Sequence, residues 1–162
     1  MSTKLSQNPY SYVSHLECSL TGQHYSHDRM RGLSDAGAPL LVRYFLDKIS
    51  EVISKDAFIQ RSPDIWRWRE FLPLPLEMEP VSLGEIETPL IAFRELPRVF
   101  IKDEGRLPTG SFKARGMAVA VSMAKHFNAN GFVVPTAGNA GSAAAAYGAA
   151  AGIPTHVYAP ID

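Results

Sequence analysis

The chain has 162 residues, of which 46% are hydrophobic and 20% charged, and its 16 lysines and arginines balance 16 aspartates and glutamates. This composition is typical of a globular domain with an apolar core and excludes a chain that is disordered throughout. The zero net charge, without a basic stripe, argues against nucleic acid as a partner. A single cysteine excludes a disulfide scaffold, and no apolar run reaches the roughly 18 residues that a membrane span needs. The first residues lack the apolar segment of a secretion signal, so we expect a cytoplasmic protein.

The first half of the chain is predicted to contain short, irregularly spaced elements. Turn residues, apolar spacing and prolines delimit them. In chain order they are a small β element over 15–45 that ends in a strand at 40–44, a helix over 46–60, a short helix that Ser62 caps, and an extended linker over 73–90.

The second half alternates regularly between strands and helices. The predicted elements are a strand at 99–102, a helix at 111–128, a strand at 132–135, a helix at 139–151 and a strand at 155–159. This alternation predicts an α/β fold with a parallel sheet and flanking helices. Residues 126–161 contain no Asp, Glu, Lys or Arg, which favours a segment buried on most sides.

Two loops follow the carboxyl ends of these predicted strands, where α/β proteins bind ligands. In the first loop, 103–116, Lys113 lies in the first turn of a helix, where a cation opposes the helix dipole. It is either a tolerated surface lysine or an amine held at the crevice as a nucleophile toward an aldehyde. Thr109 and Ser111 of the same loop can be ordinary turn and capping residues.

The second loop, 135–142, precedes the alanine-rich helix. Asn139 can be a plain helix cap there. Alternatively, the free backbone N–H groups at this helix start bind a carboxylate or a phosphate, and Asn139 adds a directed side-chain amide.

Taken together, the two loops resemble the fold-type II pyridoxal-phosphate enzymes, a group that includes threonine synthase, the threonine and serine dehydratases and cysteine synthase. The resemblance rests on the motif PTGSFKARG at 108–116, which follows KDE at 102–104, and on TAGNAG at 136–141. Earlier segments, at 16–44, 66–70 and 83–90, are most similar to the threonine synthase branch. The resemblance therefore runs from about residue 12 to the last residue.

This resemblance implies pyridoxal 5′-phosphate as the cofactor. Lys113 would form the Schiff base with the cofactor and then move protons, Asn139 would hydrogen-bond the ring hydroxyl, and Ser111 would also contact the cofactor. The substrate carboxylate would be held by Thr136, Ala137, Gly138 and Ala140. The implied reaction is that of a lyase in threonine biosynthesis, which converts O-phosphohomoserine and water to threonine and phosphate.

The N-terminal segment departs from this family pattern. Members of the group often begin with a small ribbon held by cysteines, whereas Cys18 is the only cysteine here. The positions where its partner cysteines would be are occupied by Thr21, by Leu33 or Ser34, and by Ala36. The nearby histidines, His15, His24 and His27, fit no common zinc motif, so we expect no metal. The expected parts are a degenerate ribbon-like element at 1–45, a helical segment with a proline-rich linker at 46–90, and an incomplete cofactor-binding α/β domain at 91–162.

The family's catalytic chain is more than twice as long as this one. The resemblance therefore implies a truncated chain without the C-terminal loop that cradles the cofactor phosphate, and we expect the isolated chain to be inactive or nearly so. Its candidate protein partners are a second copy of itself in a homo-oligomer or a complementing C-terminal chain. We expect a small amino-acid substrate and neither a membrane nor a nucleic-acid partner. Two other functions stay open: a threonine or serine dehydratase, and a non-catalytic remnant.

Overall fold

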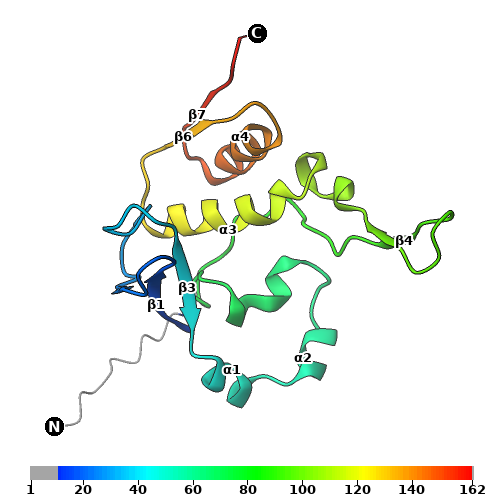
Figure 1. Ribbon diagram of the computed structural model, residues 1–162, viewed down its shortest axis with the longest axis horizontal. Helices are drawn as coiled ribbons and strands as arrows, with labels where there is room; N and C mark the ends of the chain where they lie inside the picture. The colour runs from blue at the N-terminus through cyan, green and yellow to red at the C-terminus, as the bar shows by residue number, and fades with distance from the viewer. Residues whose placement is uncertain (1–10, 162) are drawn as a thin grey trace. The chain divides into compact units, whose positions relative to one another are not determined.

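The computed structural model describes residues 11–161 (Figure 1). The described chain divides into two compact units. The N-terminal unit comprises residues 11–61 and 68–78, and the C-terminal unit comprises residues 62–67 and 79–161. No helix within the described stretch is long and apolar enough to cross a membrane.

The N-terminal unit is built on a three-stranded antiparallel sheet with the strand order β2-β1-β3. Its strands are β1 (Val13–Cys18), β2 (His24–Tyr25) and β3 (Leu40–Tyr44). Gly22, with φ of +72°, closes the turn between β1 and β2 in the left-handed region that favours glycine. The predicted β element and its last strand are therefore confirmed.

The single helix predicted over 46–60 is wrong, because the structure has two short helices there. They are α1 (Leu46–Val52) and α2 (Lys55–Ile59). Between them Ile53 is extended, with φ of −137° and ψ of 133°. The adjacent β-branched residues Val52 and Ile53 weaken a helix at this point, and Ser54 then takes the N-cap position of α2.

The short helix expected after Ser62 is a 3₁₀ helix, η1 (Ile65–Phe71). Asp64 fixes its start, because its Oδ1 accepts hydrogen bonds from the backbone N–H groups of Trp66 at 2.7 Å and of Arg67 at 3.2 Å. Asp64, rather than the predicted Ser62, is therefore the residue whose side chain satisfies the free amides of the first turn.

The C-terminal unit carries most of the regular structure. Its further elements are β4 (Leu90–Ala92), β5 (Phe100–Lys102), η2 (Glu104–Arg106), η3 (Pro108–Gly110), α3 (Lys113–His126), β6 (Phe132–Pro135), α4 (Asn139–Ala151) and β7 (Thr155–Tyr158). The helices and strands predicted from residue 98 onward agree with these bounds to within two residues at each end.

The pairing of β5 differs from the prediction of one parallel sheet. The strand β5 pairs antiparallel with β4, a strand that the sequence assigned in part to a linker. The turn between them is closed by a hydrogen bond from Phe93 N to Val99 O at 2.9 Å, and Arg98 in this turn has φ of +76°. Because the connection is a tight turn rather than a crossover, the two strands can only be antiparallel neighbours.

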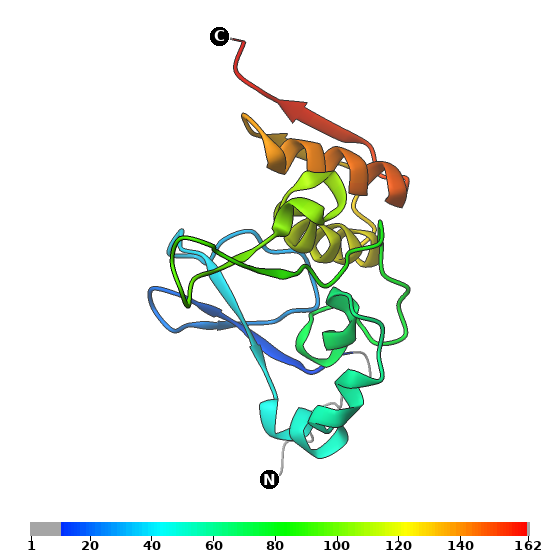
Figure 2. The same ribbon diagram turned by 90° about the vertical axis from the view of Figure 1, so that its right-hand side faces the viewer.

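The strands β6 and β7 do form the predicted parallel pair, with Phe132 opposite Thr155 and Pro135 opposite Tyr158. The connecting helix α4 packs against both strands on one side and against α3 on the other. Figure 2 shows α4 between the β6–β7 pair and α3. Gly152, with φ of +69°, ends α4 in the left-handed conformation that is usual for a C-terminal glycine.

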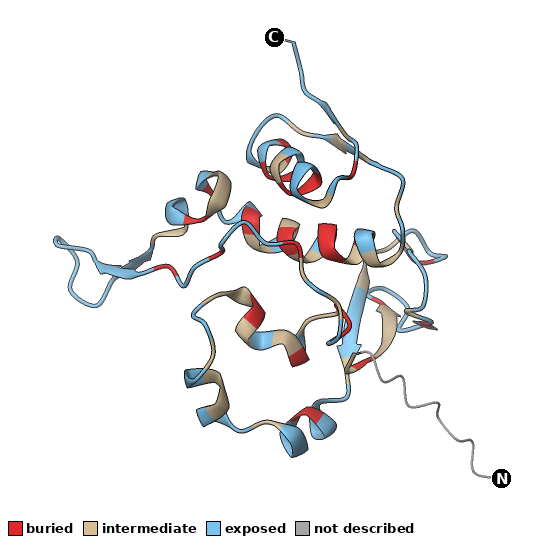
Figure 3. Cartoon of the chain, turned by 180° about the vertical axis from the view of Figure 1, so that it is seen from behind, coloured by how far each residue is buried: buried red, intermediate tan, exposed pale blue. Residues whose placement is uncertain are grey.

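Burial in the C-terminal unit is concentrated on the two long helices (Figure 3). The buried positions of α3 and α4 include Ala114, Ala118, Val121, Ala143, Ala144 and Tyr147. By contrast, most of β6 and β7 is half-buried or exposed, which differs from the burial predicted for the whole uncharged segment. The physical reason is that α4 covers only one face of this two-stranded pair.

Candidate functional site

The loop between β5 and α3 is anchored by an ion pair between Glu104 and Arg115. Arg115 donates from Nε to Glu104 Oε2 at 2.7 Å and from Nη2 to Oε1 at 2.9 Å, a bidentate arrangement. Thr88 Oγ1 donates to the same carboxylate at 2.5 Å, and Lys102 Nζ donates to Thr88 O at 2.5 Å. These contacts join β5, the loop and the start of α3, so they hold the first turn of α3 in place.

We expect this ion pair to make the stability of the fold sensitive to acid. The hydrogen bonds from Arg115 lower the pKa of Glu104 from 4.5 to about 2, against the opposing effect of burial. Because the folded-state pKa is lowered, the stabilisation is fully present above the unfolded-state pKa and is lost as the pH falls from about 5 toward about 2.

The measurement is the thermal unfolding midpoint between pH 6 and pH 3. We expect the midpoint of Glu104→Gln to fall less over this window than that of the unaltered protein, because the glutamine does not titrate. Glu95→Gln, in the exposed turn between β4 and β5, is the matched control and should keep the original acid dependence. Equal acid dependence in all three proteins would contradict the assignment.

Lys113 is the first residue of α3, and its side chain is exposed. Its Nζ lies 4.7 Å from the centroid of the Phe112 ring, which is itself 58% exposed. The amine is therefore placed over an aromatic face at the beginning of a helix, within reach of a small molecule. This position agrees with the predicted place of Lys113 in the first helical turn.

Next to Lys113, the turn formed by η3 contains two hydroxyl groups that lack partners. Ser111 is buried, and its Oγ and the Oγ1 of Thr109 are enclosed without a hydrogen-bond partner among the described residues. Thr109 also has φ of +64°, a left-handed conformation that is unusual for a threonine, and Gly110 follows with φ of +70°. Unpaired buried hydroxyls and a strained turn together favour a site built to receive a polar ligand.

The second predicted loop lies between β6 and α4. Thr136 N donates to Tyr158 O at 2.9 Å, which fixes the loop to the end of β7, and Gly138 N donates to Thr136 Oγ1 at 3.2 Å. No side chain caps the N-terminus of α4, and Asn139 is exposed, as are Ala137 and Gly138, while Ala140 is half-buried. Asn139 is thus the first residue of α4 and not its cap, and the amide groups of residues 139 and 140 have no side-chain cap, which suits the alternative of an anion site.

The fold brings the two loops into one region of the C-terminal unit, because α4 packs against both η3 and α3. On the other side of α4, Gly141 lets this helix lie close to β7 and to the end of β6, since a Cβ there would lie 2.6 Å from Thr136 Cγ2 and 2.7 Å from Val157 Cγ1. Within the described chain, Lys113 and Asn139 make no direct hydrogen bond to each other. The loops are therefore neighbours, but they do not follow strands of the same sheet as predicted.

A buried carboxylate, which the sequence reasoning missed, supports α4 from within the unit. Glu85 is 1% exposed and accepts hydrogen bonds from Trp66 Nε1 at 3.2 Å, from Ser82 Oγ at 2.6 Å and from Leu83 N at 2.9 Å. The Tyr147 hydroxyl of α4 also donates to it. Burial alone would raise the pKa of Glu85, but the hydrogen bonds from Leu83, Ser82 and Tyr147 outweigh it and lower this pKa.

The same contact acts in the opposite direction on the tyrosine. Burial, and then the hydrogen bond to Glu85, raise the pKa of Tyr147 well above its usual value. The tyrosine therefore remains a hydrogen-bond donor at neutral pH. Glu85 lies in the segment 83–90 that carries part of the family resemblance, which is the one signal in the sequence that could have drawn attention to it.

Comparison with protein families matches residues 81–162 to the family described as "Pyridoxal-phosphate dependent enzyme". The chain belongs to this family. The matched stretch contains both loops, and the match confirms the expected resemblance and the cofactor class.

Several curated relatives are named threonine synthase. The one from Methanosarcina acetivorans is 37% identical over 153 residues, which cover 90% of this chain and 37% of the relative. The one from Methanocaldococcus jannaschii is 33% identical over 141 residues, covering 83% of this chain and 35% of the relative. The one from Halalkalibacterium halodurans is 43% identical over 98 residues, covering 57% and 28% respectively. The chain thus spans less than two fifths of the length of these relatives.

Proposed function

We propose that this protein acts as a pyridoxal-phosphate-dependent lyase of the threonine synthase type, which converts O-phosphohomoserine and water to threonine and phosphate. The observation that carries the proposal is the exposed amine of Lys113 at the start of α3, beside the unpaired hydroxyls of Thr109 and Ser111. The relatives named threonine synthase support the choice of reaction.

The residues present suit the cofactor. The Lys113 amine would hold pyridoxal phosphate covalently through the cofactor's aldehyde. The cofactor would give the buried hydroxyl of Ser111 a hydrogen-bond partner, and Asn139 would donate a hydrogen bond to the ring hydroxyl of the cofactor. Bound there, the cofactor supplies the electron sink for the reaction at the substrate carbons. When it is not bound to the cofactor, the Lys113 amine would accept and return a proton beside the substrate.

The start of α4 is the proposed binding place for the substrate carboxylate. Its open N–H groups and the positive end of the helix dipole favour a negative charge. Thr136 adds a hydroxyl donor, and the small side chains of Ala137, Gly138 and Ala140 let a carboxylate approach the backbone. Gly138 N already donates to Thr136 Oγ1 at 3.2 Å and Gly141 N to Gly138 O at 2.9 Å, so the amides of residues 139 and 140 are those that remain for a ligand.

The other expectations for the protein also remain proposals. Two contacts of Cys18 support a degenerate ribbon. Its thiol donates to Ser34 Oγ at 3.1 Å, and Thr21 N donates to Cys18 Sγ at 3.3 Å. Hydrogen bonds therefore join positions that would hold a metal ion in a complete ribbon. Part boundaries at residues 45 and 90, a cytoplasmic location and a homo-oligomer or complementing chain stay predictions.

The decisive test of the reaction type compares two products of the purified protein supplied with pyridoxal phosphate. Where a complementing C-terminal chain completes the site, we expect phosphate and threonine from O-phosphohomoserine and no 2-oxoacid from threonine or serine. The 162-residue chain alone is expected to be inactive or nearly so. Lys113→Ala should abolish the reaction, whereas Lys125→Ala, an exposed lysine near the end of α3, should not change it. Formation of a 2-oxoacid without phosphate release would favour the dehydratase, and neither product would favour the non-catalytic remnant.

A further inference from the structure

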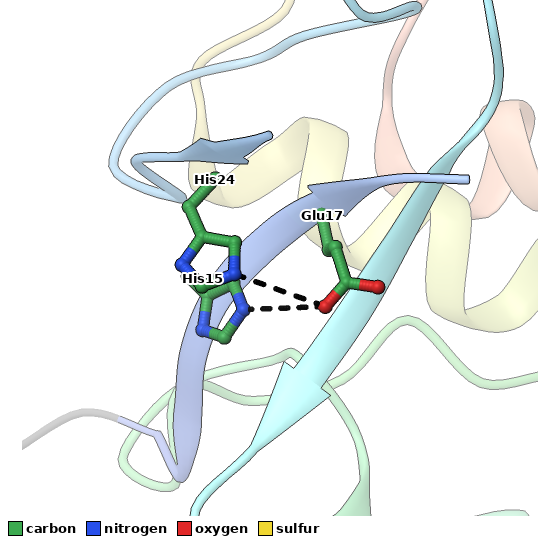
Figure 4. A group of neighbouring side chains, drawn as sticks. All are labelled: His15, Glu17 and His24. Carbon is green, nitrogen blue, oxygen red and sulfur yellow. Dashed lines mark ion pairs between the residues drawn. The ribbon is translucent and has the colours of Figure 1, made fainter. Parts of the chain in front are cut away.

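A second cluster of potential ligands lies on the sheet of the N-terminal unit, apart from the proposed cofactor site. It consists of His15 and Glu17 on β1 and His24 on β2 (Figure 4). Alternation along β1 places His15 and Glu17 on the same face of the sheet, and His24 is directly opposite Glu17 in the antiparallel pair. The strand register, rather than flexible loops, therefore brings the three side chains together.

The distances within the cluster are close to those between ligands of one metal ion. Glu17 Oε2 lies 3.8 Å from His15 Nε2 and 3.9 Å from His24 Nε2, and one ligand atom from each residue falls within a 4.8 Å limit. Zinc bonds of about 2.1 Å in a tetrahedron separate neighbouring ligand atoms by about 3.4 Å. The two nitrogens therefore lie only about 0.5 Å farther from the carboxylate oxygen than neighbouring zinc ligands do.

One of these ligand atoms, His15 Nε2, is buried without a hydrogen-bond partner among the described residues. Glu17 Oε2, at 3.8 Å, is too far from this nitrogen for a hydrogen bond. Ser14 Oγ lies 2.8 Å from the other ring nitrogen, Nδ1, so Nδ1 can donate to this hydroxyl and leave the Nε2 lone pair directed at the cluster. A buried ring nitrogen that faces a carboxylate oxygen is satisfied by a proton or by a metal ion held between them.

The neighbouring groups leave this position open. Arg43 Nη2 on β3 donates to the other carboxylate oxygen, Glu17 Oε1, at 2.7 Å, so Oε2 stays available. The charge of Arg43 opposes a nearby cation and so weakens, but does not block, a metal site. The His15 and His24 rings stack with centroids 3.8 Å apart and 30° between their planes, so the His24 ring must turn out of this stack to direct its Nε2 at a shared ion. The His24 side chain is 63% exposed, which leaves room for this rotation and for water as a further ligand.

We propose that His15, Glu17 and His24 bind one divalent transition-metal ion, with Zn²⁺ as the preferred ion. Two imidazoles and one carboxylate are a ligand set that zinc accepts, with water in the fourth position, whereas Mg²⁺ and Ca²⁺ require mainly oxygen ligands. This site differs from the cysteine ribbon, because its ligands do not include Cys18. Bound metal would also fasten the two-residue strand β2 to β1.

The test titrates the purified, metal-free protein with Zn²⁺ in equilibrium dialysis and with Co²⁺ by visible absorption. We expect one ion per chain and the absorption bands of low-coordinate Co²⁺. His24→Asn and Glu17→Gln should each weaken binding about a hundredfold. Because the His24 side chain is mostly exposed, His24→Asn should keep the fold, which circular dichroism checks.

Three control variants distinguish this cluster from other sources of metal binding. His27→Asn, a histidine just beyond β2, and Cys18→Ser should bind Zn²⁺ as the unaltered protein does. Arg43→Met should bind it more tightly, because the opposing positive charge is gone. The proposal is overturned if the unaltered protein binds no stoichiometric Zn²⁺, or if His27→Asn or Cys18→Ser loses binding while His24→Asn retains it.

Discussion

Replacing Glu85 with leucine is expected to lower the free energy of unfolding by about 3–5 kcal/mol. The carboxylate is the common acceptor for Trp66, Ser82, Leu83 and Tyr147, and its removal leaves the enclosed donors among them without a partner. Tyr147 is itself fully buried on α4, so water cannot replace the lost acceptor there. Urea or thermal unfolding of the two proteins measures the loss.

Glu87→Leu is the matched control for Glu85→Leu. Glu87 lies two residues further along, is exposed, and pairs with Arg67 Nη1 at 2.9 Å. As an exposed ion pair it should contribute no more than about 1 kcal/mol. In a double-mutant cycle, Tyr147→Phe should cost clearly less in the Glu85→Leu background than in the original protein, because its partner is already gone. Additive losses, or equal losses for Glu85→Leu and Glu87→Leu, would contradict the role assigned to this network.

Replacing Gly148 with alanine should destabilise the C-terminal unit by about 1–3 kcal/mol, although alanine is the better helix former. A Cβ at this position would lie 2.0 Å from Thr155 Oγ1, 3.2 Å from Thr155 Cβ and 3.2 Å from Ile153 O. Rotating the threonine relieves only the first of these contacts, so α4 must move away from β7. The thermal unfolding midpoint followed by circular dichroism reports the effect.

The chain offers a helical glycine with open surroundings for comparison. No atom within 4 Å would meet a Cβ at Gly116 of α3, so Gly116→Ala should raise stability by up to about 1 kcal/mol. Adding Thr155→Ala to Gly148→Ala should restore part of the loss, because it removes the closest contact. If both glycine variants were stabilised alike, the close packing of α4 on β7 would be refuted.

Local signals explain which parts of the fold the sequence predicts well. The helix α4 was predicted at its observed bounds because an open loop precedes Asn139 and a glycine that can adopt the left-handed conformation follows Ala151. The pairing of β5 was not predicted, because it depends on a turn at 93–99 without the usual glycine or asparagine signals, and because Pro89 beside β4 suggested a linker.

In the candidate site too, local sequence signals predict some residues, whereas contacts between distant residues leave no such signal. Lys113 and Asn139 each follow a recognisable strand and begin a helix, so their positions could be predicted from neighbours in the sequence. The contact between Glu85 and Tyr147 joins residues 62 positions apart and leaves no local pattern. The histidine cluster was missed for a related reason, since its spacing follows the two-residue period of a strand and a cross-strand register rather than a zinc motif.

Capture of the cofactor at one lysine tests the central claim most directly. The purified protein is mixed with pyridoxal phosphate, reduced with borohydride, and digested so that peptide masses locate the modified lysine. We expect stoichiometric labelling of Lys113, while Lys102, whose amine is bound to Thr88 O, and the exposed Lys125 stay unlabelled. Labelling scattered over these lysines, or none at Lys113, would contradict a cofactor site at the start of α3.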